Sequence, residues 1–325
     1  FTPPTSAYSA NTIDSANFQP DIVWLKDRTS ANAHGIFDSS RLSYPAIASN
    51  AANAEGGGFG SALTGFLSNG FSLGASSTVN TSGNNYISWL WKESPTSGMD
   101  IVSYTGTGSN RTISHSLGVA PDMIIVKSRS GLLSPSVYHV SVGNTAVLKL
   151  DTTETPTTAS TFWQNTSPSA SVFSVGTHSN VNANGGEYIA YLFAEVDGFS
   201  KFGSYTGNAA ADGPFIYTGF KPRYVMIKSS TATDAWLIYD TARDTYNVAG
   251  TTLVPNTTAA DATISGIDFL SNGFKLRTIT TTPNAAQTYI YAAFAEQPFY
   301  YSAQSSAAST PATSGGATFL MGMPF

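Results

Sequence analysis

The chain has 325 residues, no cysteine and a formal net charge of −5. The absence of cysteine excludes disulfides and thiolate metal sites, and the scattered Lys and Arg residues argue against a nucleic-acid partner. No apolar run of about 18 residues is present, so the sequence predicts a soluble protein without membrane insertion. Charged residues make up 11% of the chain, against roughly 25% in an average protein, which predicts a polar but weakly charged surface.

Three apolar runs, each opened by a proline, recur at intervals of 101 residues. They span Pro20 to Lys26, Pro121 to Lys127 and Pro222 to Lys228. Short runs of β-branched and aromatic residues of this kind are typical of strands. The spacing predicts three tandem copies of one β module.

A second repeated run gives the strongest strand signal in each copy. It covers residues 86–93, 188–195 and 289–296. In the first copy Ile87, Trp89 and Trp91 share one face of the strand, while Tyr86 and Leu90 take the other. Both faces are apolar, so both must be covered.

The sequence also predicts two hairpins and few helices. Ser-Asn-Gly occurs at residues 68–70 and 271–273, and Asn-Gly favours a tight turn because both residues tolerate positive φ. Between these signals the copies are rich in Thr, Ser, Gly and Asn, with no helical periodicity.

Six to eight short strands per 100 residues predict a β-sandwich or jelly-roll-like module that buries a core of its own. The predicted organisation is an N-terminal arm (1–19), three β modules (20–97, 98–198 and 199–300) and a flexible tail (301–325) with an apolar end. Phe319, Leu320, Met321 and Phe325 form that end. They are expected to dock in an assembly or to pack on the third module.

Two motifs place an Asp three residues before an Arg. They are Asp38 with Arg41 and Asp240 with Arg243, whereas the second copy has His139 and Val142 at these places. The favoured interpretation is a turn cap with an exposed ion pair, worth roughly 0 to 1 kcal/mol.

An alternative is glycoside hydrolysis, which needs two carboxylates about 5 to 10 Å apart. The candidate pairs are Asp38 with Glu93 and Asp240 with Glu296. Because Glu93, Glu195 and Glu296 recur once per copy at strand ends, a structural role is favoured and no catalytic residue is predicted.

No metal or cofactor is predicted either. The four histidines lack zinc-site spacing. Loop carboxylates such as Asp234, Asp244 and Asp261 are of the kind that Ca²⁺ binds, but they have no EF-hand or nonapeptide spacing.

Aromatic residues in polar surroundings are the candidates for ligand binding. Trp163, Trp236 and Tyr246 could stack on a sugar ring or anchor an interface if exposed. For the two tryptophans, burial under a loop is the favoured interpretation.

Four stretches together resemble a known family. They are Pro20 to Arg28, Phe37 to Arg41, Ser68 to Phe71 and Tyr86 to Trp91. The chain resembles a repeat module of unassigned function in virion proteins of tailed phages, especially phages of marine bacteria and cyanobacteria. The resemblance spans about residues 18–299, is best in the first copy and is weakest in the second. It implies a structural or tail-fibre-like role with a lectin-like sandwich, and it brings no catalytic residues.

These observations lead to the expectation of a virion structural protein, most simply a tail fibre or appendage that contacts the host surface without catalysis. The alternatives are a capsid-surface decoration or head fibre protein and a polysaccharide-degrading appendage enzyme. Expected partners are other virion proteins, a host surface glycan or protein, and further copies of the chain, with a trimer favoured. Several weak sites on one particle can together give strong attachment.

Overall fold

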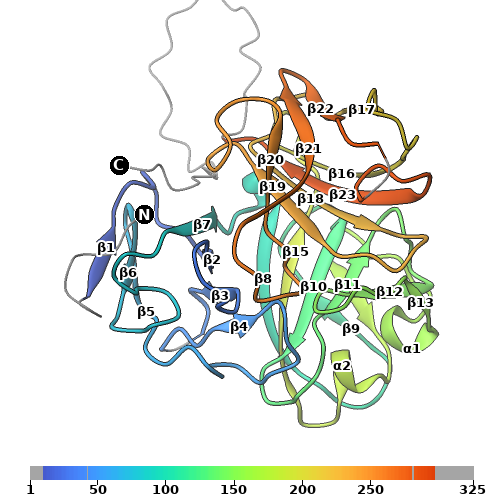
Figure 1. Cartoon of the computed structure of the whole chain (residues 1–325). Coiled ribbons are helices and arrows are strands. Elements are labelled where there is room, and N and C mark those ends of the chain that lie inside the picture. The colour runs from blue at the N-terminus through green and yellow to red at the C-terminus, as the bar shows by residue number, and fades with distance from the viewer. Residues whose placement is uncertain (1–9, 42, 280–281, 297–325) are drawn as a thin grey trace, which may run out of the picture.

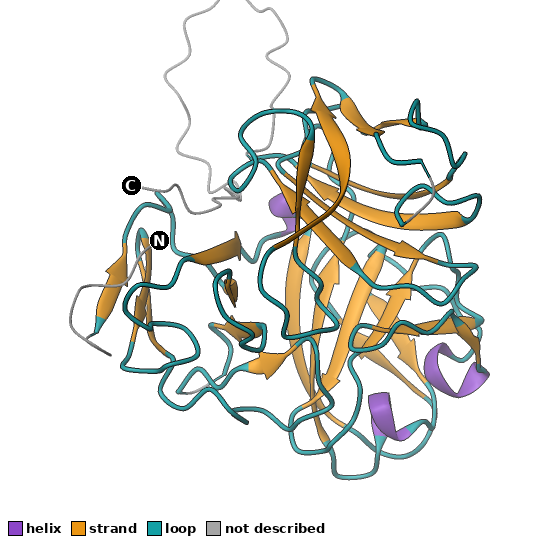
Figure 2. Ribbon diagram, in the orientation of Figure 1, coloured by secondary structure: helices purple, strands orange, loops and turns teal. Residues whose placement is uncertain are grey.

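The computed structural model describes residues 10–41, 43–279 and 282–296. In these ranges the chain is mostly antiparallel β-sheet with a few single-turn helices (Figures 1 and 2), which confirms the predicted all-β class. No helix in this part of the chain is long and apolar enough to cross a membrane. The expected tail at 301–325, with Phe319, Leu320, Met321 and Phe325, lies outside the described residues.

The first segment, residues 10–91, forms two sheets with the strand orders β4-β3-β2-β7 and β1-β6-β5. The strands are β1 (Asn11–Ile13), β2 (Ile22–Asp27), β3 (Gly35–Asp38), β4 (Ile47–Ala48), β5 (Leu63–Leu67), β6 (Gly70–Leu73) and β7 (Tyr86–Trp91). β1 lies within the expected N-terminal arm and pairs with β6.

A 3-10 helix, η1 (Pro95–Ser97), leads into the second segment, residues 99–193. Its sheets have the orders β13-β12-β11-β10-β15-β8 and β14-β9. The elements are β8 (Met99–Thr105), β9 (Arg111–Ser114), β10 (Met123–Ser128), β11 (Ser136–His139), β12 (Ala146–Lys149), β13 (Thr157–Thr158), α1 (Ser160–Trp163), β14 (Val172–Val175), α2 (Ser179–Asn182) and β15 (Glu187–Phe193).

The third segment, residues 200–294, has sheets of order β16-β23-β18-β19 and β17-β22-β21-β20. The strands are β16 (Ser200–Thr206), β17 (Phe215–Tyr217), β18 (Tyr224–Ser229), β19 (Leu237–Asp240), β20 (Ala249–Thr252), β21 (Ala262–Leu270), β22 (Gly273–Leu276) and β23 (Thr288–Phe294). In the described residues, each strand ladder joins two strands of the same segment.

The central strands send alternate side chains into two different cores. In β2, Val23 and Leu25 enter a core inside the first segment, whereas Ile22 and Trp24 enter a core shared by all three segments. β7 alternates in the same way. Both apolar faces predicted for residues 86–91 are therefore covered.

The shared core surrounds an approximate threefold axis. The ring centroids of Trp91, Phe193 and Phe294, one from each segment, lie 5.9, 5.8 and 5.9 Å apart. The space beside them is a cavity of about 20 Å³ with apolar walls from all three segments. Such a space holds about one water molecule, so the axis is packed core. The first and second segments also have a buried cluster of their own, whereas the buried residues of the third segment are continuous with the shared core.

Both predicted Asn-Gly hairpins are present, closed by the pairs Leu67 with Gly70 and Leu270 with Gly273. A Cβ on Gly70 would lie 1.7 Å from the Ile13 carbonyl oxygen, and one on Gly273 would lie 2.1 Å from the Ile216 carbonyl oxygen. The edge strands β1 and β17 can therefore pack this closely only because the turns end in glycine.

Candidate functional site

A chain of buried and half-buried charged groups joins the first segment to the second. The Asp38 carboxylate accepts a hydrogen bond from Arg41 Nε at 2.8 Å, and Arg41 Nη1 lies 3.0 Å from Glu55. Glu55 also accepts two hydrogen bonds from Arg129 of the second segment, at 2.8 and 3.0 Å. The Tyr191 hydroxyl donates to Asp38 at 2.7 Å. Two carboxylates thus bind two guanidinium groups and a phenol across the junction.

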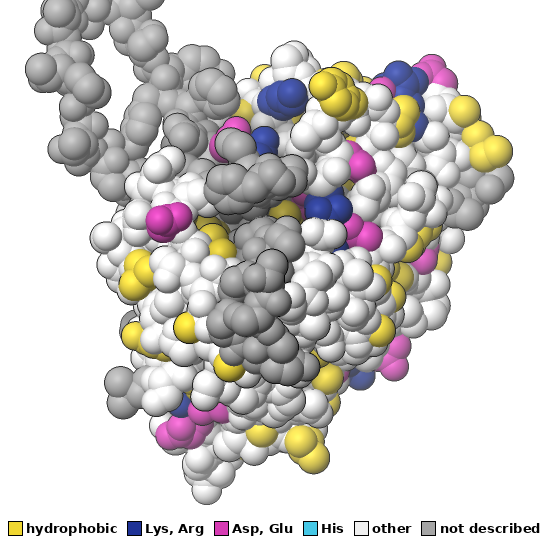
Figure 3. Space-filling model, turned by 60° about the vertical axis from the view of Figure 1, so that its left-hand side comes forward, with side chains coloured by type: hydrophobic (Ala, Val, Ile, Leu, Met, Phe, Trp, Pro, Cys, Tyr) yellow, Lys and Arg dark blue, Asp and Glu magenta, His cyan; other side chains and the backbone are white. Residues whose placement is uncertain are grey.

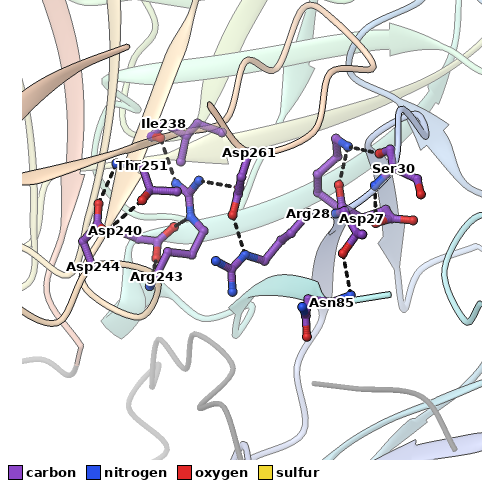
Figure 4. A network of polar contacts seen from close by, with 12 residues as sticks. Asp27, Arg28, Ser30, Asn85, Ile238, Asp240, Arg243, Asp244, Thr251 and Asp261 are labelled. Carbon is purple, nitrogen blue, oxygen red and sulfur yellow. Dashed lines mark hydrogen bonds and ion pairs between the residues drawn. The ribbon is translucent and has the colours of Figure 1, made fainter. Parts of the chain in front are cut away.

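The same arrangement joins the third segment to the first (Figure 4). Arg243 Nε lies 2.6 Å from Asp240, and Arg243 Nη1 lies 3.1 Å from Asp261. Asp261 also accepts from Arg28 Nε at 2.7 Å. Trp89 Nε1 lies 3.4 Å from Asp240, in the place that the Tyr191 hydroxyl takes at the first junction.

The sequence predicted exposed ion pairs at Asp38–Arg41 and Asp240–Arg243. The ion pairs are present, but the prediction that they are exposed was wrong. The side chains are 1% or less accessible in both pairs. The bridging acid and an arginine of the neighbouring segment cover them, which the local sequence does not reveal. Burial alone raises the pKa of Glu55, but the hydrogen bonds from Arg129 and Arg41 lower it overall.

The junction between the second and third segments is neutral at this place. His139 is buried, with Nε2 3.1 Å from the Tyr291 carbonyl oxygen, and its Nδ1 accepts from the Ser141 amide at 3.2 Å. These partners require the proton on Nε2. Burial lowers the pKa of His139 to about 4, although the bond to the Tyr291 carbonyl opposes the shift.

Three buried lysines occupy equivalent places at the ends of β2, β10 and β18. Lys127 Nζ donates to the Ala52 carbonyl of the preceding segment at 3.2 Å, and Lys228 Nζ donates to the Thr153 carbonyl at 3.2 Å. Lys26 Nζ donates to the carbonyls of Asp27 and Ser30. Burial lowers the pKa of each lysine from 10.5 to about 8. Two of these lysines therefore bind neighbouring segments together.

The carboxylate pairs considered for glycoside hydrolysis do not share partners. Glu93 accepts a hydrogen bond from the Ile101 amide at 3.1 Å. Its pKa is raised to about 7, mainly by burial and also by a hydrogen bond with Asp100. Asp38 instead lies buried against Arg41 and Tyr191.

The other two repeated glutamates pair with basic groups. Glu195 lies 2.5 Å from Lys201, and Glu296 lies 3.7 Å from Arg223. Asp240, the suggested partner of Glu296, is held in the buried network with Arg243. The repeated acids in the described residues thus hold strand ends and junctions together.

The loop carboxylates considered for Ca²⁺ are dispersed as well. Asp244 accepts from the Thr251 amide and hydroxyl at 2.6 and 2.8 Å, and Asp261 bridges two arginines. Asp234 lies in a separate cleft. In the described ranges, no three acidic or histidine side chains come together as a metal site.

Of the three candidate ligand-binding aromatics, only Tyr246 is exposed, at 85%. Trp163 packs in the core of the second segment, and Trp236 donates from Nε1 to the Lys149 carbonyl at 3.0 Å. Both tryptophans are 2% exposed, so their rings offer no face to a ligand. The burial that the sequence favoured for Trp163 and Trp236 is confirmed.

Figure 3 shows a largely uncharged polar surface on which hydrophobic side chains form small separate groups. The third segment exposes two further aromatic side chains on β17, Phe215 at 44% and Tyr217 at 62%. Phe215 and Tyr217 are two residues apart on a short strand, so they point to the same face. This alternation in the sequence could have identified them as an exposed aromatic pair.

A cleft opens on the third segment beside β19. Its volume is about 450 Å³, which lies within the range of small-molecule sites. Its walls are Thr233, Asp234, Ala235, Leu237, Ile264, Thr282, Ala285 and Gln287. Burial raises the pKa of Asp234, while the Ala235 amide and Lys228 partly offset this. The cleft combines a carboxylate, an amide and hydroxyls with an apolar wall.

Two polar groups of this cleft have bonding capacity left. Within the described residues, Asp234 accepts one protein hydrogen bond, from the Ala235 amide at 3.0 Å. Gln287 uses its oxygen for Ser229 and Tyr289, and in this part of the chain its Nε2 group donates to no protein acceptor. One acceptor and one donor therefore remain available at the same cleft.

The first segment shows why these groups are available. Asn32 and Asn84 stand at the positions of Asp234 and Gln287, and both donate to Asp27, at 2.8 and 2.7 Å. The third segment has Ser229 in place of Asp27. With this anchoring carboxylate missing, Asp234 and Gln287 do not converge on a shared acceptor as Asn32 and Asn84 do.

The fold and contacts define an all-β protein of several antiparallel sheets with a buried core to which residues from all three segments contribute. The chain belongs to the family described as "Domain of unknown function (DUF7483)", whose model matches residues 5–298. No curated protein and no solved structure is significantly similar to it.

Proposed function

We propose that this chain is a virion structural protein of a tailed phage, part of a tail fibre or appendage, and that it contacts the host surface by non-catalytic binding. The cleft of the third segment is the observation that carries this proposal. It offers Asp234 as an acceptor and Gln287 as a donor beside the side chain of Ile264. A polyhydroxylated ligand such as a surface glycan supplies both donors and acceptors, which suits this mixed set.

The buried ionic chains support the same assignment. Asp38, Arg41, Asp240 and Arg243 hold the segments together, so these repeated charged residues serve structure. The partners proposed are other virion proteins and a host glycan.

Binding of the purified, fluorescently labelled full chain to cells of the infected bacterium tests the assignment. We expect saturable binding that cell-surface polysaccharide from the same strain competes away. Asp234→Ala and Gln287→Ala should each weaken it at least tenfold, because one of two directional hydrogen bonds to the ligand is lost. Asp212→Ala, which removes an exposed carboxylate of the same segment outside the cleft, is the matched control and should bind normally.

Absence of binding by the unaltered chain would count against host contact. Binding that both cleft variants retain would keep host contact and reject the cleft as its site. Thermal melting of each variant establishes that it is folded.

Cryo-electron microscopy of the intact particle tests the location. A tail fibre or appendage requires the chain to project from the tail with a free distal face. If the chain instead lies flat on the capsid shell, decoration replaces attachment as its role.

A further inference from the structure

The two crossings between segments differ in one charged residue. The first crossing carries Glu93 just after β7, and the second carries Glu195 just after β15. The next strand then has Asp100 as its second residue at the first crossing and Lys201 at the second. Glu195 forms an ion pair with Lys201 at 2.5 Å. The first crossing therefore has an acid where the second has the base.

The two acids of the first crossing are close neighbours. The Ile101 amide donates to both of them, to Asp100 Oδ1 at 2.9 Å and to Glu93 Oε1 at 3.1 Å. A further hydrogen bond joins the two carboxyl groups directly. Two carboxyl groups can form such a bond only if one of them is protonated, because an ionised carboxylate has no donor.

The surroundings decide which acid carries the proton. Asp100 is 4% exposed, and its Oδ2 accepts from both the amide and the hydroxyl of Ser116. Together with the Ile101 amide, these donors favour the ionised form of Asp100. In the described residues Glu93 accepts only from the Ile101 amide. Glu93 is therefore the protonated acid, and its hydroxyl donates to Asp100.

The other charged groups nearby do not neutralise this pair. Asp21 also faces Glu93, and it is already paired with Lys92 at 3.0 Å. His115 lies near Asp100, but burial lowers its pKa below 6.5, so it is uncharged at neutral pH. Among the residues that the structure describes, no basic side chain forms an ion pair with either Glu93 or Asp100.

We propose that Glu93 and Asp100 share one proton and form a pH-sensitive link between the first and second segments, strong when the proton is bound and weak once it is lost. Loss of the proton leaves two like charges side by side in a place largely removed from water. The pKa of Glu93, about 7, puts this change near neutral pH. The Glu195–Lys201 pair attracts on both sides of that pH, so the two crossings respond differently.

A metal ion between the acids is the competing explanation. The Ile101 amide takes one oxygen of each acid, and Ser116 takes the second oxygen of Asp100. These oxygens face donors, which a cation would have to displace. The part of the chain that the structure describes also has no group of three acidic or histidine side chains suited to a metal. We therefore assign a proton, and Ca²⁺ enters the test below.

Carbon-13 NMR of the side-chain carboxyl groups in the full chain measures where the proton is lost. The Glu93 signal, assigned by its absence in Glu93→Gln, should titrate with a midpoint near pH 7. Asp100→Asn should lower this midpoint by about one pH unit or more, because it removes the charge that retains the proton. A midpoint below pH 5 would overturn the proposal. So would a midpoint that Asp100→Asn leaves unchanged, since burial alone would then explain it.

Urea unfolding provides a second measurement that does not depend on Asp100→Asn being folded. Gln at position 93 can still donate to Asp100 and accept from Ile101, but it has no proton to lose. Between the ordinary glutamate pKa and about 7, the folded chain keeps a proton that the unfolded chain has lost. The stability of the unaltered chain therefore falls as pH rises through this range.

Relative to Glu93→Gln, the unfolding constant of the unaltered chain should grow about tenfold or more from pH 5 to pH 8. Glu195→Gln, at the second crossing, is the matched control and should show no such growth. A constant ratio for Glu93→Gln would overturn the proposal. Stabilisation of the unaltered chain by Ca²⁺ at pH 8, absent in Glu93→Gln, would overturn it in favour of a cation.

Discussion

The side chain of Arg243 is buried and pairs with two carboxylates. Asp240 and Asp261 both bind it, and its Nη2 group donates to the Ile238 carbonyl at 2.9 Å. A guanidinium group that is held away from water keeps its charge, so its stability contribution depends on its partners. Arg41 has the equivalent environment at the first junction.

Asp240→Asn should therefore destabilise the fold by about 3 kcal/mol, because it leaves part of a buried positive charge uncompensated. Urea unfolding measures the change. The control is Glu154→Gln in the exposed Lys149–Glu154 pair, where the Glu154 side chain is 57% accessible and the expected change is about 0 to 1 kcal/mol. Equal effects of the two substitutions would contradict a buried network.

The residue pattern predicted the two Asp–Arg pairs but misjudged their surroundings. The spacing of three residues is local, whereas Glu55 binds Arg41 from 14 residues away and is itself bound by Arg129, 74 residues further along the chain. The cleft was missed for a similar reason, since Asp234 and Gln287 come from different loops. Comparing Asp27 with Ser229 across the copies could have indicated it, because that exchange removes the anchor of Asn32 and Asn84.

At the scale of elements, the packing of an edge strand depends on the residue that ends the neighbouring turn. β17 pairs with β22 through Ile216 and Phe274, and Gly273 begins β22 directly under the Ile216 carbonyl. A side chain at this position meets backbone, which has little freedom to move away.

Gly273→Ala should lower the unfolding free energy by about 2 kcal/mol or more, since relieving the clash displaces β17 from β22. Thermal or urea unfolding measures this. Gly250→Ala in the same sheet is the control: the nearest atom to a Cβ there is a Thr263 methyl carbon at 3.3 Å, and the expected cost is below about 1 kcal/mol. Equal unfolding free energies of the two variants would show that the close approach of Gly273 to the Ile216 carbonyl does not matter for stability.

Strand existence and alternation could be predicted from sequence, but the neighbours of each face could not. Trp24 and Trp89 lie in strands as expected. An apolar strand face indicates only that something covers it. Here the cover for one face is the equivalent sheets of the other two segments, so no second chain is needed to bury these faces.

For the whole molecule, the three buried lysines set a common dependence on pH. The pKa of Lys26, Lys127 and Lys228 falls from 10.5 to about 8 on burial. Between these values the unfolded chain binds more protons than the folded chain. Stability should therefore rise with pH from about 8 to 10.

Urea unfolding at several pH values tests this. Lys127→Met should reduce the slope by up to about 1.4 kcal/mol per pH unit, the contribution of one proton. Lys149→Met removes a lysine whose side chain is 31% accessible and should leave the slope unchanged. A stability that is flat between pH 8 and 10 in the unaltered chain would contradict the expectation.

The neutral junction at His139 has a consequence for how such a molecule can change. In an assembly of three identical chains, a substitution in the gene changes the same residue at every contact. Loss of the aspartate and arginine would then remove all three ionic chains together. With three copies in one gene, a single junction can lose its charges while the other two keep theirs, as His139 and Val142 illustrate. The same independence lets one segment carry the cleft beside β19 while the others retain the contacts that hold the segments together.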